Sequence, residues 1–483
     1  MRKSTIGGIA WRLSAVAVLL VAIGCAVNPA TGERQLMLIS EEQEIAMGKE
    51  AHGQILASMG VYQDDQTQAY VAAIGQQLAA LSERPNLPWT FTVIDDPIVN
   101  AFALPGGYIY VTRGIMTHLS SEAELVSVLG HEIGHVTGRH GANRMSKAQL
   151  ASIGLGVGMI ASPKFARFGD LAQQGVGLLF LKYSRDDERQ ADDLGVRYTV
   201  NGGWDVREMP AVFGVLKNVS QLSGAGRLPN WLSTHPDPDN RARRINEQIG
   251  QLGRDFTNAK RNRPTYFDRL DGMVFGADPR QGYFEERTFF HPELAFKLVF
   301  PEGWSTQNQT QAVVGQSQEQ DAIVALTLES EADLQAAAKA FLSQEGLEAG
   351  RTQSGRIHGF PAVKAEFKVP REENSIYGQV GFVRYKDNTY RLLGYTLESK
   401  WSTYGKPIAN FIGSFDKVTD RRVLSVQPAR VKVVQLRRDT PFAEFARRYP
   451  SPSVKPELLA LINHTTPEGV VPAGDAKQVV GGR

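Results

Sequence analysis

Cysteine is almost absent from this chain, because Cys25 is the only one in 483 residues. No disulfide within the chain can therefore stabilise it, and its stability must come from burial of an apolar core. An excess of charge is also lacking: there are 53 Lys and Arg against 51 Asp and Glu. The first 24 residues hold three of the basic residues and no acidic one, which leaves 50 against 51. Such a balance gives no electrostatic reason to expect nucleic-acid binding.

The two conspicuous apolar stretches are both too short to cross a bilayer, which takes about 20 residues. The first, from Leu13 to Ile23, follows Arg2, Lys3 and Arg12 and is typical of a signal peptide. The second, from Ala151 to Ala161, is rich in glycine and is either a lid over a cleft or a core segment.

Cys25 stands directly after the apolar stretch of the signal peptide. The segment Ala22-Ile23-Gly24-Cys25 resembles the lipobox of bacterial lipoproteins, with Ala22 where leucine is commonest. We therefore expect lipidation of Cys25, and simple signal cleavage is the alternative. Ala26 after the cysteine favours sorting to the outer membrane, by resemblance to bacterial sorting rules. The expected location is the periplasm, with a lipid anchor.

The most informative pattern is His131-Glu132-Ile133-Gly134-His135, which spells H-E-x-x-H. Residues four apart lie on one face of a helix, so both imidazoles can reach one metal ion while Glu132 points beside it. Ser121-x-x-Glu124 is a capping-box pattern that would begin this helix. Five apolar residues then recur at helical spacing: Leu125, Val128, Leu129, Ile133 and Val136. The alternative is a core helix whose histidines form only hydrogen bonds.

A catalytic zinc site needs a third protein ligand. One candidate is His140, because the segment begins like a pattern in which a third histidine follows three residues after Gly138. That position is occupied by Gly141. His140 also falls on a different helical face from His135, so we reject it as a ligand.

The second candidate lies in an acidic helix that is predicted to begin after Ser184 and to end at residues 201–203. Glu188 and Asp192 are four residues apart and share a face of this helix. Glu188 can therefore reach the metal, while Asp192 accepts a hydrogen bond from a ligating imidazole and fixes its tautomer. Without the two histidines, this acidic start would be typical of a solvated surface.

Four motifs in this chain resemble those of the M48 family of zinc metallopeptidases, in the family's order. They are Asn100 to Tyr108 (NAFALPGGY), HEIGHVTGRH, SRDDERQAD and Ser233-Thr234-His235-Pro236. The resemblance covers about residues 28 to 250 and is closest to bacterial periplasmic lipoprotein members. It implies a mostly helical gluzincin-type peptidase domain. His131, His135 and Glu188 match the ligand positions, Glu132 the general base and Asp192 the family's second acidic position.

The expected cofactor is one Zn²⁺ per chain, which would activate a water and polarise the scissile carbonyl. Glu132 would take the proton of the water and deliver it to the leaving amine. An extended peptide is expected to pair with an edge strand at Tyr108 to Thr112. His235 has three interpretations: it stabilises the oxyanion, it fills the open zinc position at rest, or it is a structural histidine before Pro236.

The expected function is that of a zinc-dependent endopeptidase that hydrolyses unfolded or misassembled cell-envelope proteins. The rival hypothesis is a chaperone or assembly factor of the outer membrane with a regulated or vestigial zinc site, although the intact Glu132 argues against a dead site. Familiar periplasmic members of the family carry tetratricopeptide repeats after the protease domain. No internal repeat is visible here, which leaves the partner open.

The expected fold class is α+β: a mostly helical zincin-like domain, then an α+β sheet domain and a small C-terminal domain. The expected divisions are a signal peptide (1–24), a tether (25–39), the peptidase domain (40–265), a linker (266–285), an accessory domain with one antiparallel sheet (286–418) and a C-terminal domain (428–483). The accessory domain contains no metal or phosphate motif, so binding or packing is its expected role.

The C-terminal domain shows a strand, two helices and a second strand, which weakly resembles the LysM glycan-binding fold. It departs from that fold at Arg438, where LysM has the glycine of its Gly-Asp-Thr. Peptidoglycan is therefore a candidate partner, and an unrelated small domain is the alternative.

Overall fold

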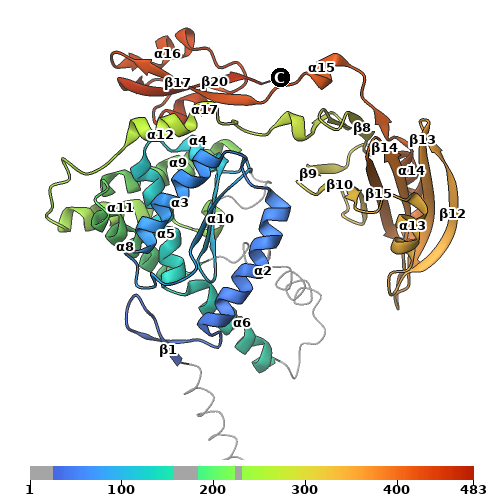
Figure 1. The fold of residues 1–483 in the computed structure, drawn as a ribbon, viewed down its shortest axis with the longest axis horizontal. Helices are drawn as coiled ribbons and strands as arrows, with labels where there is room; N and C mark the ends of the chain where they lie inside the picture. The colour runs from blue at the N-terminus through green and yellow to red at the C-terminus, as the bar shows by residue number, and fades with distance from the viewer. Residues whose placement is uncertain (1–24, 156–182, 224–230, 483) are drawn as a thin grey trace, which may run out of the picture. The chain divides into compact units, whose positions relative to one another are not determined.

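The computed structural model of the chain describes residues 25–155, 183–223 and 231–482 (Figure 1). It divides into two compact units. Unit 1 contains the N-terminal part of the chain through Gly276, except Ala57–Met59, together with Arg430–Val480; unit 2 is essentially Ala277–Ala429. The predicted signal peptide and the end of the Ala151 to Ala161 stretch lie outside the described residues. Within the described ranges, we find no helix with the length and apolar character of a membrane span.

The central element of unit 1 is helix α5 (Glu122–Thr137), which is buried along its whole length. Its start is the predicted one, because the Ser121 side chain accepts a hydrogen bond from Glu124 N at 3.1 Å. The second half of the predicted capping box is displaced by one residue, since the Glu124 carboxylate accepts from Ser120 N at 2.6 Å. A full capping box begins α2 at Ser40.

The N-terminal part of unit 1, through Gly276, contains nine further α-helices among the described residues, and Figure 1 shows α5 between α3 and α8. They are α2 (Glu41–Met59), α3 (Asp65–Ala79), α4 (Arg113–His118), α6 (His140–Leu155), α8 (Arg185–Asn201), α9 (Met209–Ser223), α10 (Trp231–Thr234), α11 (Pro238–Gln251) and α12 (Arg263–Leu270). A peptidase-like domain that is mostly helical was the expectation from sequence.

A three-stranded sheet covers part of α5. Its order is β3 (Thr90–Ile94), β5 (Tyr108–Thr112) and β4 (Ala101–Leu104), with β3 parallel and β4 antiparallel to β5. The prediction that Tyr108 to Thr112 forms an edge strand was therefore wrong, because β5 is central. Among the described residues, the edge strands of this sheet are β3 and β4, and β4 was not predicted.

The segment expected to be a tether contains a small antiparallel hairpin of β1 (Cys25–Val27) and β2 (Arg34–Leu36). We call residues 25–36 the N-terminal hairpin. Its Asn28 side chain donates to Gly138 O at 3.4 Å, and Gln35 donates to the same oxygen at 3.4 Å. The hairpin is thus fastened to the end of α5.

Residues 430–480 belong to the same unit as α5. They form β17 (Ala429–Leu436), β18 (Thr440–Pro441), α16 (Phe442–Arg448), α17 (Pro456–Ile462), β19 (Val470–Val471) and β20 (Gly474–Gly481), in the expected strand, helix, helix, strand order. The buried Lys477 donates to Thr117 O at 3.1 Å and to Leu119 O at 2.5 Å. These bonds fix β20 against the turn that precedes α5.

Unit 2 contains two antiparallel sheets, whereas one was predicted. The seven-stranded sheet has the order β12 (Glu348–Ile357), β13 (Phe360–Val369), β14 (Ile376–Tyr385), β15 (Asn388–Leu397), β11 (Ala322–Glu329), β10 (Ala312–Gln316) and β9 (Ser305–Asn308). The four-stranded sheet contains β16 (Asp416–Lys417), β8 (Phe296–Val299), β7 (Thr288–His291) and β6 (Tyr283–Glu285).

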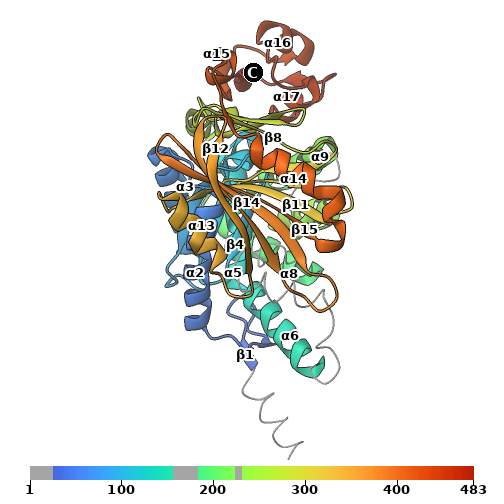
Figure 2. The same ribbon diagram turned by 90° about the vertical axis from the view of Figure 1, so that its right-hand side faces the viewer.

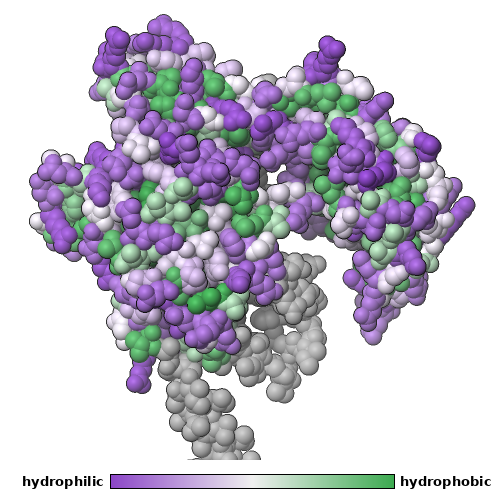
Figure 3. Space-filling model, in the orientation of Figure 1, coloured by the Kyte–Doolittle hydropathy of each residue, from purple (hydrophilic) through white to green (hydrophobic). Residues whose placement is uncertain are grey.

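Two helices pack on the seven-stranded sheet, and Figure 2 shows both of them against its strands. Phe411 of α14 (Trp401–Gly413) packs in a cluster with Leu392, and Phe341 of α13 (Leu334–Leu342) packs in another with Phe382. Between β16 and β17 the chain forms a short helix, α15 (Arg421–Leu424). On the face shown in Figure 3, hydrophilic side chains separate small apolar patches.

Candidate metal centre

The site lies where α8 crosses α5, and glycines allow the two helices to approach closely. A Cβ on Gly134, between the two histidines of the motif, would lie 2.9 Å from Ala191 Cα. A Cβ on Gly130 would lie 3.3 Å from Gly195 Cα. Since α8 passes over this glycine face of α5, its Glu188 is brought beside the histidines.

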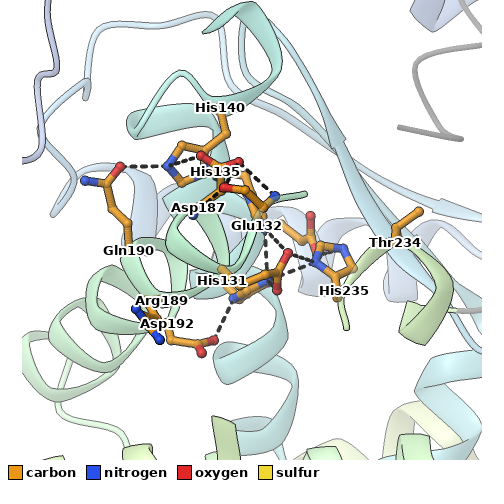
Figure 4. Close-up of polar contacts among 12 residues, drawn as sticks. His131, Glu132, His135, His140, Asp187, Arg189, Gln190, Asp192, Thr234 and His235 are labelled. Carbon is orange, nitrogen blue, oxygen red and sulfur yellow. Dashed lines mark hydrogen bonds and ion pairs between the residues drawn. The ribbon is translucent and has the colours of Figure 1, made fainter. Parts of the chain in front are cut away.

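Four buried side chains converge at this crossing: His131, His135, Glu188 and His235, whose ligand atoms all lie within 4.8 Å of one another (Figure 4). His131 Nε2 is 3.0 Å from His135 Nε2 and 3.2 Å from His235 Nδ1. Glu188 Oε1 is 2.9 Å from His235 Nδ1 and 3.6 Å from His135 Nε2. Ligand atoms around a tetrahedral ion with bonds of about 2.1 Å would be about 3.4 Å apart, so the cluster has the dimensions of such a site.

The remaining residues singled out in the sequence surround this cluster. Asp192 Oδ1 lies 3.0 Å from His131 Nδ1, the nitrogen that faces away from the cluster. His140 begins α6 and is not one of the four converging residues; its Nδ1 lies 2.8 Å from His135 Nδ1. The side chain of Cys25 lies outside what the structure describes.

Glu132 is fully buried beside the cluster. Its Oε1 accepts from Trp231 Nε1 at 3.3 Å, and His235 Nε2 lies 3.6 Å from the same oxygen. Its Oε2 has no hydrogen-bond partner among the described residues. Burial and the neighbouring Glu188 raise the pKa of Glu132 to about 8. The positive charge of a bound cation would lower this pKa and favour the ionised carboxylate.

Burial keeps the imidazoles neutral. It lowers the pKa of His131 to about 4, with a further contribution from the Arg241 charge. Burial also holds the pKa values of His135 and His235 well below their usual range. For Glu188, burial is opposed by Arg241, and the pKa rises to about 7. Neutral imidazoles offer lone pairs, which is the protonation state that metal binding requires.

Arg241, on α11, was missed by sequence analysis as a residue of the site. Its Nη1 lies 2.6 Å from Glu188 Oε2, and its Nη2 donates to Asp192 Oδ1 at 2.7 Å. Burial alone would raise the pKa of Asp192, but Arg241 and the hydrogen bond to His131 hold it below its usual range. Asp192 is therefore an ionised acceptor for the outer nitrogen of His131.

Aromatic side chains complete the surroundings. The Trp231 ring stacks on His235 with 4.5 Å between centroids, and the Tyr183 ring stacks on His135 at 3.7 Å. The Arg241 guanidinium lies 4.8 Å from the Trp231 ring centroid. No local pattern marked these residues, although Trp231 stands only four residues before His235 and shares its turn.

The donor set fits a divalent cation. Three neutral imidazole nitrogens and one carboxylate are the ligand types of zinc sites, and the outer nitrogen of His131 has the carboxylate partner common at such sites. Two buried glutamates with raised pKa values would also be stabilised by a nearby positive charge.

Comparison with known proteins agrees with the geometry. A beta-barrel assembly-enhancing protease of Yersinia pestis is 29% identical over 272 residues, which are 54% of this chain and 53% of that protein. A putative beta-barrel assembly-enhancing protease of Vibrio cholerae is 32% identical over 219 residues (44% and 45%). The mitochondrial metalloendopeptidase OMA1 of Arabidopsis thaliana is 33% identical over 165 residues (34% and 32%).

This chain thus spans about half the length of the two bacterial relatives. Residues 65–249 match peptidase family M48, and that range contains all four converging side chains. Residues 65–249 are therefore similar to the peptidases of family M48.

Proposed function

We propose that this protein is a zinc-dependent endopeptidase that hydrolyses unfolded or misassembled polypeptides of the cell envelope. The observation that carries the proposal is the convergence of His131, His135, Glu188 and His235 within 4.8 Å, with the Glu132 carboxylate beside them. The match to peptidase family M48 supports it.

The residues of the site have separable roles in this proposal. His131, His135 and Glu188 hold the metal. Zinc, when bound, supplies Lewis acidity that activates water and polarises a carbonyl. Glu132 accepts the proton of the attacking water and returns it to the leaving amine. Asp192 fixes His131 with its Nε2 facing the metal.

The substrate is proposed to bind as an added strand on the free edge of β4. A hollow next to His135 is lined by the end of this strand, by α5, and by the start of α6: Ala103, Leu104, Pro105, Val136, Gly141 and Ala142 are among its residues. An extended peptide on β4 would run past this hollow and present main chain to the site. Recognition through main-chain hydrogen bonds tolerates many sequences, as degradation of unfolded proteins requires.

His235 is proposed to block the site at rest by acting as a fourth ligand. Its Nδ1 lies 2.9 Å from Glu188 Oε1 and 3.2 Å from His131 Nε2, so it stands where water and substrate would have to bind. A catalytic zinc site keeps that position open. Movement of His235 out of the cluster would then be a condition for activity.

The relatives' names support a role in the envelope, because two of them are described as beta-barrel assembly-enhancing proteases. The rival hypothesis remains an assembly factor of the outer membrane in which the zinc site is regulated or vestigial. The two differ in a measurable way, since only the peptidase needs the metal and Glu132 for its action.

The proposed location is the periplasm, with a lipid on Cys25 that anchors the protein to the outer membrane. Residues 428–483 are proposed to contact peptidoglycan, by their resemblance to LysM. Cys25→Ala is expected to abolish acylation and to leave the protein unanchored or unprocessed. Metabolic labelling with a fatty acid, followed by membrane fractionation, checks this. Wild-type protein without lipid and with the same distribution as Cys25→Ala would contradict the anchor.

The peptidase proposal is tested by removing and restoring the metal. The full chain and its His235→Ala variant are stripped with a chelator and assayed for cleavage of casein, an unfolded protein. Zinc should restore cleavage at about one ion per chain, whereas magnesium and calcium, which prefer oxygen ligands, should not. Cleavage that survives complete metal removal would contradict the proposal.

A further inference from the structure

Asn28, in the N-terminal hairpin, is fixed in one orientation. Only 5% of its surface is exposed. Its Oδ1 accepts from Ala30 N at 2.9 Å, so its Nδ2 must point the other way. Nδ2 donates to Gln190 Oε1 at 3.0 Å and to Gly138 O at 3.4 Å. The hairpin therefore contacts α8 two residues beyond Glu188, a residue of the metal cluster.

Gln190 also forms a hydrogen bond with His140. The same Gln190 Oε1 lies 2.6 Å from His140 Nε2, and Figure 4 shows this contact together with the one between His140 and His135. Because a carbonyl oxygen only accepts, His140 Nε2 must carry the hydrogen. In a neutral imidazole, His140 Nδ1 is then an acceptor, and it lies 2.8 Å from His135 Nδ1.

The direction of donation therefore sets the tautomer of His135. His135 Nδ1 must donate to His140, which leaves the lone pair of His135 Nε2 free and facing the cluster. Asp192 does the same for His131 through a charged carboxylate. The support for His135 is a neutral chain of hydrogen bonds that ends in the N-terminal hairpin.

The space for this chain is shaped by Gly138. A Cβ at this position would lie 2.4 Å from His140 Nε2 and 2.7 Å from Gln190 Oε1. Real Cβ atoms do not make contacts this short, so any larger residue at position 138 would displace the side chains of His140 and Gln190. Because Gly138 has no side chain, His140 can contact Gln190 and His135 at the same time.

We propose that the N-terminal hairpin, through Gln190 and His140, positions His135 for metal binding. The proposal rests on the metal site of the proposed function. It makes the contact of Asn28 with Gln190 a determinant of metal affinity, although the hairpin contributes no ligand. Asn28, Gln190 and His140 are positioning residues. Partners of ligating histidines typically contribute ten- to a hundredfold to metal affinity.

The test measures the zinc affinity of the full chain by competition with a chromophoric chelator. Gln190→Leu removes the acceptor and should weaken zinc binding by about ten- to a hundredfold. Gln190→Glu keeps an acceptor oxygen at the same place and should retain the wild-type affinity. A residue with only a structural role would not show this rescue, because the charged substitution is the less conservative one for folding.

The hairpin itself is tested with a matched pair. Asn28→Ala removes the contact with Gln190 and should weaken zinc binding in the same direction as Gln190→Leu. Gln35→Ala removes only the other hairpin contact with Gly138 O, of the same length, and should leave the affinity unchanged. The melting temperature of each metal-free variant reports whether it is folded.

Three outcomes would overturn this inference, and the first of them leaves the proposed function intact. If Glu188→Ala loses zinc while folded Asn28→Ala and Gln190→Leu bind it like wild type, the positioning chain is wrong and the metal site stands. If the wild-type chain binds no zinc, both are wrong. Asn28→Ala and Gln35→Ala with equal losses would mean that the hairpin acts only by general packing, which also overturns the inference.

Discussion

The carboxylate of Asp192 faces the imidazole of His131, with 3.0 Å between Oδ1 and Nδ1. Arg241 donates to that same carboxylate oxygen at 2.7 Å and keeps Asp192 ionised. The imidazole of His131 thus contacts a buried carboxylate from α8, and that carboxylate is paired with a buried guanidinium from α11.

Asp192→Ala is expected to weaken zinc binding by about ten- to a hundredfold, because His131 loses the acceptor that fixes its tautomer. The matched control is Asp193→Ala on the next residue, which pairs with Arg244 and whose side chain is 51% exposed. Zinc affinity, measured by chelator competition, should fall in the first variant only. Equal affinities in the two variants would remove Asp192 from the site.

Glu188→Ala is expected to lose both the metal and the activity, because it removes the only carboxylate among the proposed ligands. Asp186→Ala, on the exposed side of the first turn of the same helix, is the control and should keep both. Metal content after dialysis against a chelator gives the measurement. Full zinc occupancy in Glu188→Ala would refute the assignment and reopen His140 as a ligand.

His235→Ala should change the rate of casein cleavage in opposite directions under the two functional interpretations of that residue. If His235 blocks the site at rest, its removal should raise the rate of casein cleavage, because water and substrate gain the position. If it stabilises the oxyanion, the same change should cost about 3 kcal/mol, roughly a hundredfold in turnover. The short contacts of His235 within the cluster favour the increase. An unchanged rate, with folding and metal content intact, would leave only a structural role.

The sequence contained enough local information to predict the two helices that carry the proposed ligands. Ser121 and Ser184 do accept hydrogen bonds from the third residue of α5 and of α8, as the capping patterns predicted. The spacing of His131 and His135 is likewise a local property. Such signals depend on residues within one or two helical turns, so they can be recognised without knowledge of the fold.

The relations that complete the site depend on packing between distant segments, and no local pattern encodes them. Arg241 pairs with Asp192 across 49 residues, and Asn28 contacts Gln190 across 162. The place of β5 in the middle of its sheet depends on β4, a strand of four residues that was too short to recognise. The same holds for unit 2, where strand patterns predicted individual strands but not their division into two sheets.

Stability should depend on pH through His118, which lies outside the metal cluster. His118 is buried next to α5, and its Nδ1 lies 2.7 Å from Gly114 O. Burial lowers its pKa to about 4, with a smaller contribution from the charge of Lys477, against about 6.5 in an unfolded chain. Between these values the unfolded state binds more protons, so this stabilisation is complete above pH 6.5 and is lost as the pH falls toward 4.

The expected slope is up to about 1.4 kcal/mol per pH unit for this one residue. Urea unfolding of the metal-free protein at pH 7 and pH 5 measures it. His118→Asn retains a donor for Gly114 O but does not titrate, so its free energy of unfolding should fall less over the same range. Identical pH dependence in the variant and the wild type would mean that His118 does not titrate as its burial predicts.

The most direct test of the account is a comparison of the wild type with Glu132→Gln, both alone and in the His235→Ala background. Zinc content and casein cleavage are measured on the same samples. The account predicts that Glu132→Gln abolishes cleavage while zinc stays at about one ion per chain, because Glu132 moves the proton and is not a ligand. Cleavage at the parental rate in a Glu132→Gln protein with full zinc would contradict the proposed mechanism.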